Sequence, residues 1–67
     1  MGAIVANGKR LELHLPCALI DFLTQSGWKP TQVVVELNGD VIPRTKLTDV
    51  QLHDGDQLEV IVPVAGG

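Results

Sequence analysis

Residues 3–15 read Ala-Ile-Val-Ala-Asn-Gly-Lys-Arg-Leu-Glu-Leu-His-Leu. The apolar start of this stretch runs into Asn7-Gly8, the dipeptide best suited to a two-residue type I′ turn between two strands. After the turn, Leu11, Leu13 and Leu15 alternate with polar residues, as in a strand that buries one face. The stretch therefore predicts a β-hairpin whose second strand directs three leucines toward the core.

A single helix is expected directly after the hairpin. Pro16 ends the strand and suits the first turn of a helix, because its φ angle is already helical. Leu19, Phe22 and Leu23 then fall on one helical face, and Gly27 is the natural cap at the C-terminal end. The predicted helix has about ten residues and no Ser, Thr, Asp or Asn cap at its start, so it depends on packing against the hairpin.

Three further segments have the character of strands: residues 33–37, 41–42 and 58–62. The first is a β-branched run that ends at a second Asn-Gly pair, and the last follows a polar Asp-Gly-Asp turn. Residues 45–52 show no clear period. A hairpin, one amphipathic helix and later strands predict an α+β domain. The order of elements favours a β-grasp arrangement, in which a mixed four- to five-stranded sheet packs on one main helix.

Size and charge exclude several classes of function. The chain has 67 residues and a net charge of −3, so we expect one thin core over residues 1–62, a tail over 63–67 and no roomy catalytic pocket. The acidic balance disfavours nucleic acids and anionic membranes as partners. No stretch approaches the ~20 apolar residues of a membrane span, and the N-terminus lacks signal-peptide features, which predicts a cytoplasmic protein. The single cysteine, Cys17, excludes an internal disulfide.

The chain ends in Pro63-Val64-Ala65-Gly66-Gly67, which is the candidate chemical site. Pro63 disfavours further sheet pairing, and two glycines without Cβ atoms can enter a narrow channel in another protein. A carboxylate presented in this way suits activation as an acyl-adenylate, followed by transfer to a nucleophile. A frayed end is the alternative interpretation, because small residues also accumulate at termini. The short distance from the last strand and the predicted β-grasp body favour the reactive end.

A partner surface is predicted beside the root of this tail. Val5, Val34 and Ile61 are expected on the face of the sheet that points away from the helix. These residues form a candidate apolar docking patch, although singly exposed apolar side chains are also ordinary on protein surfaces. Arg44 is a further candidate, for contact with an acidic group of a partner, with a solvated arginine as the alternative.

The remaining polar and sulfur side chains predict no catalytic or metal site. Cys17 lies near the expected helix start, where a thiol becomes more reactive, yet a lone cysteine is more often a small buried apolar residue. His14 and His53 lack partners at metal-ligand spacing. Asp54 and Asp56 are interpreted as turn formers.

Three segments occur in a distinctive order and spacing. Residues 36–44 read Glu-Leu-Asn-Gly-Asp-Val-Ile-Pro-Arg, residues 53–61 read His-Asp-Gly-Asp-Gln-Leu-Glu-Val-Ile, and residues 64–67 read Val-Ala-Gly-Gly. Together they resemble the ThiS family, the sulfur carrier proteins of bacterial thiamine biosynthesis. The resemblance covers essentially the whole chain.

This resemblance implies a ubiquitin-like β-grasp protein that is not itself an enzyme. Gly67 would be adenylated by a separate ubiquitin-activating-type adenylyltransferase, which uses ATP and magnesium, while this chain binds no cofactor. Sulfur from a cysteine desulfurase or a related donor would convert the adenylate to a thiocarboxylate. Val64, Ala65 and Gly66 would enter the partner's active site, and thiazole synthase would receive the sulfur.

Other functions remain open at the level of sequence. The tail is also similar to that of the small subunit of molybdopterin synthase, which implies sulfur transfer to a different acceptor. A ubiquitin-like modifier would instead join Gly67 to an amine as an isopeptide, and a plain interaction module would leave its terminus chemically idle.

Overall fold

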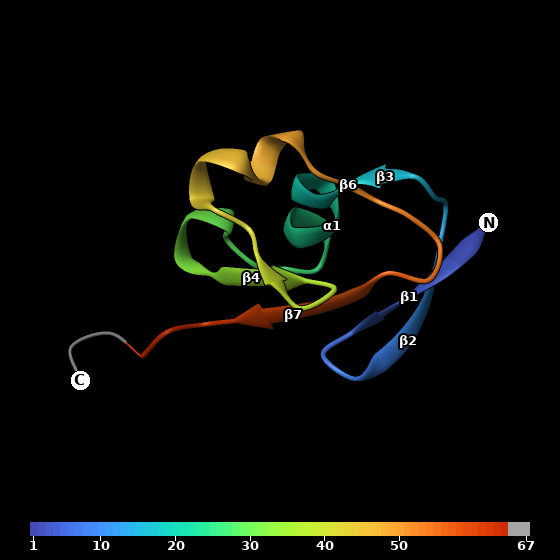
Figure 1. Ribbon diagram of the computed structural model, residues 1–67, viewed down its shortest axis with the longest axis horizontal. Helices are drawn as coiled ribbons and strands as arrows, with labels where there is room; N and C mark the ends of the chain where they lie inside the picture. The colour runs from blue at the N-terminus through green and yellow to red at the C-terminus, as the bar shows by residue number, and fades with distance from the viewer. Residues whose placement is uncertain (65–67) are drawn as a thin grey trace.

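The computed structural model describes residues 1–64 of the chain. A mixed five-stranded sheet lies beneath the helix α1 (Leu19–Gln25), which crosses one of its faces (Figure 1). The strand order is β2-β1-β7-β4-β5, with β1 and β7 parallel and the other neighbours antiparallel. The strands are β1 (Gly2–Ala6), β2 (Lys9–Leu13), β4 (Val34–Leu37), β5 (Asp40–Val41) and β7 (Gln57–Ile61). This arrangement confirms the predicted α+β, β-grasp architecture.

Both Asn-Gly pairs form the tight turns that the sequence predicts. Asn7 and Gly8 have φ angles of 52° and 79°, and the turn they form sets Ala6 opposite Lys9. Positive φ at both central residues is the signature of the type I′ turn, whose twist matches that of the flanking strands. Asn38 and Gly39 repeat the conformation between β4 and β5. The turns therefore fix the register of both hairpins.

The helix starts three residues later than predicted. Cys17 and Ala18 form the short strand β3, which pairs antiparallel with β6 (Gln51–Leu52) in a second, two-stranded sheet. The Leu19 N–H then donates to the Val50 carbonyl at 3.0 Å. Because Cys17, Ala18 and Leu19 pair with this distant segment, Pro16 lies in a bend before β3 and the helix has only seven residues.

The helix ends in a Schellman motif that uses the predicted glycine. Gly27 has a φ of 90°, and its N–H donates to the Thr24 carbonyl, while the Trp28 N–H donates to the Leu23 carbonyl. This pair of bonds satisfies carbonyls that the helix end leaves free. The turn also directs Trp28 back onto the core, where its ring centroid lies 6.4 Å from that of Phe22.

Two short 3-10 helices lie in segments for which the sequence predicts no helix or strand. They are η1 (Pro30–Gln32) and η2 (Arg44–Asp49), and η2 packs beside α1 over the same face of the sheet (Figure 1). Only Leu47 of η2 is buried. A single buried residue in a six-residue turn carries no detectable period, which explains why this element escaped prediction.

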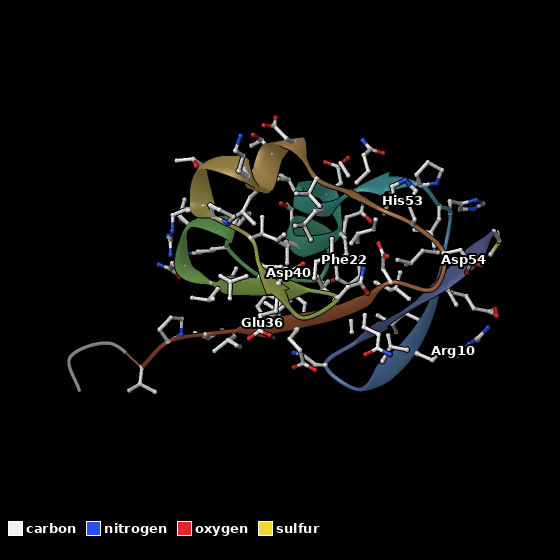
Figure 2. All side chains as sticks on the ribbon, in the orientation of Figure 1. Arg10, Phe22, Glu36, Asp40, His53 and Asp54 are labelled. Atoms are coloured by element: carbon white, nitrogen blue, oxygen red, sulfur yellow. The ribbon has the colours of Figure 1, made fainter. Side chains whose placement is uncertain are left out.

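The core lies between the sheet and the layer formed by α1 and η2. Figure 2 shows Phe22 directed from α1 toward the sheet. All buried residues in the described part of the chain are apolar, and none is charged. Within residues 1–64, no helix has the length and apolar character needed to cross a membrane. The core consists of Ile4, Ala6, Leu19, Phe22, Leu23, Val33, Val35, Leu47, Leu52, Leu58 and Val60.

Candidate functional site

Strand β7 connects the centre of the sheet to the tail, and its residues alternate between two environments. Leu58 and Val60 are buried against the core, whereas Gln57, Glu59 and Ile61 are exposed on the opposite face. We call this opposite face, which neither α1 nor η2 covers, the open face. Each strand of the main sheet contributes to it through the alternation of its side chains.

The open face carries three apolar side chains on the strands nearest the tail. The register places Val34 of β4 directly opposite Ile61 of β7. Val41 of β5 lies opposite Glu36 on the same face, with 60% of its surface exposed, and Ile61 is 44% exposed. We call Val34, Val41 and Ile61 the tail-side patch. Val34 and Ile61 are predicted site residues, and the structure places them directly opposite each other on neighbouring strands.

A pair of carboxylates adjoins the tail-side patch. Glu36 of β4 and Glu59 of β7 are cross-strand partners. They are the next pair along these two strands whose side chains share a face with Val34 and Ile61. Figure 2 shows Glu36 on the side of the sheet away from Phe22 and α1. Like charges that stand directly opposite each other oppose strand pairing. A cationic group of a binding partner placed between them would relieve that repulsion, so this edge of the patch suits a basic partner surface.

Val5 shares the open face but lies apart from the tail-side patch. It stands opposite Gln57, at the start of β7, and opposite Arg10 of β2. Gln57 and Ile61 are four positions apart in β7, which is about 13 Å at the rise of an extended strand. Val5 is therefore on the predicted face, at the end of β7 that is distant from the tail.

The last residues of β7 are held by the side chain of Asn7. Its Oδ1 accepts a hydrogen bond from the Val60 N–H at 2.7 Å, and its Nδ2 donates to the Val60 carbonyl at 3.2 Å. The parallel ladder between β1 and β7 ends at Ala6 and Leu58. The amide of Asn7 thus continues this ladder to Val60, immediately before the chain leaves the sheet.

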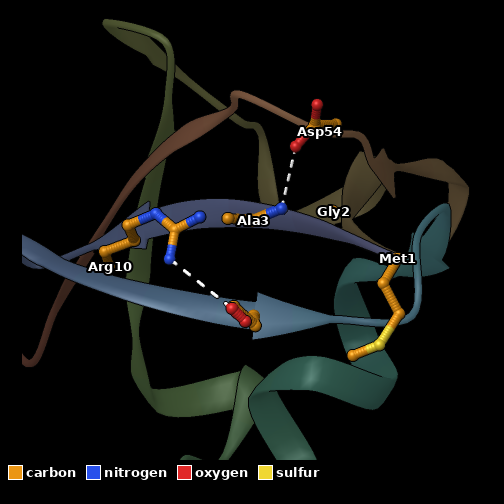
Figure 3. Close-up of a pocket in the computed structure, with 6 residues that line it drawn as sticks. Met1, Gly2, Ala3, Arg10 and Asp54 are labelled. Carbon is orange, nitrogen blue, oxygen red and sulfur yellow. Dashed lines mark hydrogen bonds and ion pairs between the residues drawn. The ribbon is translucent and has the colours of Figure 1, made fainter.

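The opposite end of β7 is held in a similar way. Asn38 accepts from the Gln57 N–H at 2.9 Å and donates to Asp56 at 3.0 Å, while Asp56 accepts from the His53 N–H at 2.9 Å. Asp54 accepts from the Ala3 N–H at 2.8 Å (Figure 3). Asp56 closes the turn at residues 53–56, as predicted, whereas Asp54 lies within this turn and its carboxylate joins the turn to β1.

The tail emerges from the sheet without burial. After Ile61 the chain has no further strand among the described residues, and Val62 and Val64 are 60% and 89% exposed. The predicted reactive residue Gly67 and the adjoining Ala65 and Gly66 lie outside the described residues. The described residues beyond β7 therefore include two exposed valines, one at the end of the domain and one in the tail.

Arg44 lies beside the root of the tail rather than on the open face. It begins η2, and its Nη1 donates to the Thr31 carbonyl. An open hollow of about 430 Å³ is found here, lined by Gln32, Arg44, Val62 and Pro63. The guanidinium thus supplies a positive charge next to the point where the tail leaves the domain, a position suited to an acidic group of a partner.

Cys17 shows no features of an activated thiol. Burial raises the pKa of its thiol, and the negative charge of Asp21 raises that pKa further. A raised pKa keeps the sulfur protonated near neutral pH, whereas nucleophilic cysteines have a lowered pKa. In residues 1–64, no cluster of three or more His, Cys, Asp or Glu side chains is placed to hold a metal ion.

Four residues of this region were not singled out from the sequence: Asn7 for its side chain, Glu36, Val41 and Glu59. A signal for three of them was present. The two-residue turn at Asn38-Gly39 dictates that Glu36 faces Val41, and the alternation within β7 puts Glu59 beside Ile61. The contact between Asn7 and Val60 joins segments 53 residues apart, and no local pattern indicates it.

Comparison with a family model gives a match to the ThiS family over residues 17–67. Among solved structures, the chain is similar to the crystal structure of thiamine biosynthesis protein ThiS from Geobacter metallireducens. The TM-score is 0.82 at 26% sequence identity, over 97% of this chain and 99% of that one. The whole β-grasp fold is therefore shared.

Two curated proteins are also similar in sequence. The uncharacterized protein ycf40 of Pyropia yezoensis is 35% identical over 97% of this chain and 92% of its own length. A thiazole synthase of Paramagnetospirillum magneticum is 28% identical over 96% of this chain, which spans 20% of that protein's length. The second match places a stretch similar to this chain within a much longer polypeptide.

Proposed function

This chain belongs to the ThiS family, and from that membership we propose that it is a cytoplasmic sulfur carrier protein of thiamine biosynthesis. The observation that carries the proposal is the family match over residues 17–67, which includes the whole tail. The structural similarity of this chain, over nearly its full length, to a thiamine biosynthesis protein supports the same proposal. The chain acts as a protein cosubstrate, and the catalytic groups belong to its partners.

The proposed chemistry takes place at the carboxylate of Gly67. A carboxylate oxygen attacks the α-phosphorus of ATP on the activating enzyme and displaces pyrophosphate, which yields an acyl-adenylate. The terminal sulfur of a persulfide, supplied through a cysteine desulfurase or a related donor, then attacks the carbonyl carbon, and AMP leaves. A thiol reductant cleaves the acyl disulfide formed in this step, so that the donor sulfur leaves as a disulfide with that thiol. The resulting thiocarboxylate holds the sulfur in a form that can be transferred. ATP and magnesium are bound by the activating enzyme.

Thiazole synthase is the proposed acceptor of the sulfur. The similarity to one fifth of a thiazole synthase supports this choice, because a polypeptide of that name contains a stretch like this chain. Molybdopterin synthase is the alternative acceptor, suggested by the likeness of the tails. Copurification separates the two: a thiazole synthase recovered with the chain supports the first, and a molybdopterin synthase large subunit contradicts it.

Intact mass measurement tests the proposal directly. We expect protein coexpressed with its activating enzyme and a sulfur donor to gain the mass difference of one oxygen replaced by sulfur, located at Gly67 by fragmentation. The same spectrum tests whether Gly67 is the terminal residue. Protein that stays unmodified beside a demonstrably active enzyme would contradict the carrier function, and larger covalent adducts would indicate a modifier.

The tail-side patch is the proposed docking surface for the activating enzyme. It is apolar, lies beside the root of the tail, and adjoins Glu36 and Glu59, so it fits a partner face with an apolar centre and a basic neighbour. We expect Ile61→Asp to weaken binding to the enzyme by about tenfold or more, because it places a charge where the proposed complex would bury an apolar side chain. Titration calorimetry without ATP measures the affinity.

Thr24→Asp is the matched control for this variant. It adds the same charge at an exposed position of α1, on the other side of the molecule from the open face. Binding of the control should equal that of the natural protein. If Ile61→Asp folds normally and binds as tightly as Thr24→Asp, the tail-side patch is not the docking surface.

A further inference from the structure

Strand β2 is an edge of the main sheet, and its outer side has free backbone groups. It pairs with β1 alone among the described strands. The two-residue turn makes Ala6 and Lys9 a hydrogen-bonded pair, and such pairs alternate along an antiparallel ladder. The N–H and C=O groups of Arg10 and Glu12 therefore point away from β1, where a further strand can bond to them.

The side chains of β2 are arranged in two sets. Arg10 and Glu12 lie on the open face and form an exposed ion pair of 3.7 Å (Figure 3). Leu11 and Leu13 lie on the opposite side of the strand, where they are half-buried against the core. An exposed ion pair of this length contributes little to stability, so both charges are available to other partners.

We propose that β2 pairs antiparallel with β2 of a second copy of this chain, with Leu11 opposite Leu11. In this register Arg10 stands opposite Glu12 of the second copy, and Glu12 stands opposite its Arg10. The backbone alternation matches, because the outward-facing residues become the hydrogen-bonded pairs and the two Leu11 residues form the closer, non-hydrogen-bonded pair. Two antiparallel copies of β2 thus match each other in the charges of their side chains and in the pattern of their backbone hydrogen bonds.

A hollow beside β2 supplies a second complementary contact. It measures about 370 Å³ and lies between the end of β2 and α1. In the proposed register Lys9 of the second copy stands opposite Leu13, on the side of the sheet that carries the hollow. Its aliphatic stem can cover Leu13, while its ammonium group faces the acidic rim at Asp21. The hollow is lined by Glu12, Leu13, His14, Cys17, Asp21, Phe22 and Gln25.

This pairing leaves the proposed reactive end free. A two-fold axis perpendicular to the sheet relates the copies, so their open faces form one surface and their tails leave in opposite directions. The tail-side patch is formed by β4, β5 and β7, away from the β2 edge. Because the contact is one short strand with exposed charges, the dimer should be weak, with a Kd on the order of 0.1 mM.

Sedimentation equilibrium and amide hydrogen exchange on the full chain test the proposal. We expect the dimer fraction to increase up to about 1 mM protein, tenfold above the expected Kd. The amides of Arg10 and Glu12 should become protected from exchange over the same range, while the Leu11 amide, already bonded to β1, stays protected throughout. A monomer over the whole range overturns the proposal, as does a dimer in which the Arg10 and Glu12 amides stay unprotected.

Charge exchange provides the matched variants. Arg10→Glu places like charges opposite each other twice in the dimer, and so does Glu12→Arg, so each should weaken association by about tenfold or more. The double variant R10E/E12R restores opposite charges at both positions and should restore association. If the single variants associate as strongly as the natural chain, or if the double variant stays as weak as the single ones, the proposed register is wrong.

Discussion

Deletion of Gly67 should abolish formation of the thiocarboxylate while leaving the fold intact. The proposed reaction needs a carboxylate on a residue without a side chain, at a fixed number of residues from the sheet. The core ends at Val60, and Val64 is 89% exposed, so the free energy of unfolding should change little. We expect the thermal midpoint to move by no more than about 3 °C. Intact mass and calorimetry measure the two effects.

Two further variants separate the position of the terminus from its composition. Gly66→Leu keeps the length of the tail and adds bulk, and one serine added after Gly67 keeps every residue but moves the carboxylate outward. Both should also fail to form the thiocarboxylate. Sulfur loading of the serine-extended protein would show that Gly67 need not be terminal, and a midpoint lowered by 10 °C or so would show that the tail is structural.

Replacement of Asn7 should lower the stability of the fold more than most substitutions in a surface turn do. Asn7→Ala removes two partly buried hydrogen bonds to Val60 and forces alanine to a φ of 52°. Backbone groups left unpaired cost about 1–3 kcal/mol, and the left-handed conformation adds about 1–2 kcal/mol. We expect the free energy of unfolding to decrease by about 3 kcal/mol in urea denaturation.

Glycine variants at Asn7 and Asn38 separate the two causes of this loss of stability, which are the lost hydrogen bonds and the positive φ. Asn7→Gly accepts the positive φ and loses only the hydrogen bonds, so it should cost about 2 kcal/mol. Asn38→Gly is the matched control, because Asn38 has the same φ but its side-chain hydrogen bonds are exposed. It should cost under about 1 kcal/mol. Equal losses at the two positions would contradict a special role for the contact with Val60.

Local patterns predicted the main sheet and the end of the helix, because their signals lie within a few residues. The turns at Asn7-Gly8 and Asn38-Gly39 and the cap at Gly27 each depend on a positive φ that few residues accept. The predicted start of the helix was wrong, because Cys17 and Ala18 form a strand with residues more than 30 positions away. Non-local pairing of this kind leaves no periodic signal in the sequence.

In the candidate site, too, local sequence patterns predicted some features, and the pairing of distant strands determined the others. Alternation along β4 and β7 correctly placed Val34 and Ile61 on one face, but only the register between the strands reveals that Glu36 and Glu59 are neighbours. Val5 satisfied the same alternation rule and lies at the other end of the face, because β1 meets β7 near Gln57. Alternation indicates which face a residue occupies, and the pairing of strands determines its position along that face.

The end of β7, which Asn7 and β4 hold in place, limits how far from the sheet the following residues can reach. Ile61 is the last residue of β7, and Gly67 follows it by six positions, so at about 3.3–3.6 Å for each residue Gly67 lies no farther than about 22 Å from Ile61. In the proposed reaction, the active site of a docked enzyme must therefore lie within this distance of Ile61. An enzyme that fixes the domain thereby fixes the effective concentration of its substrate.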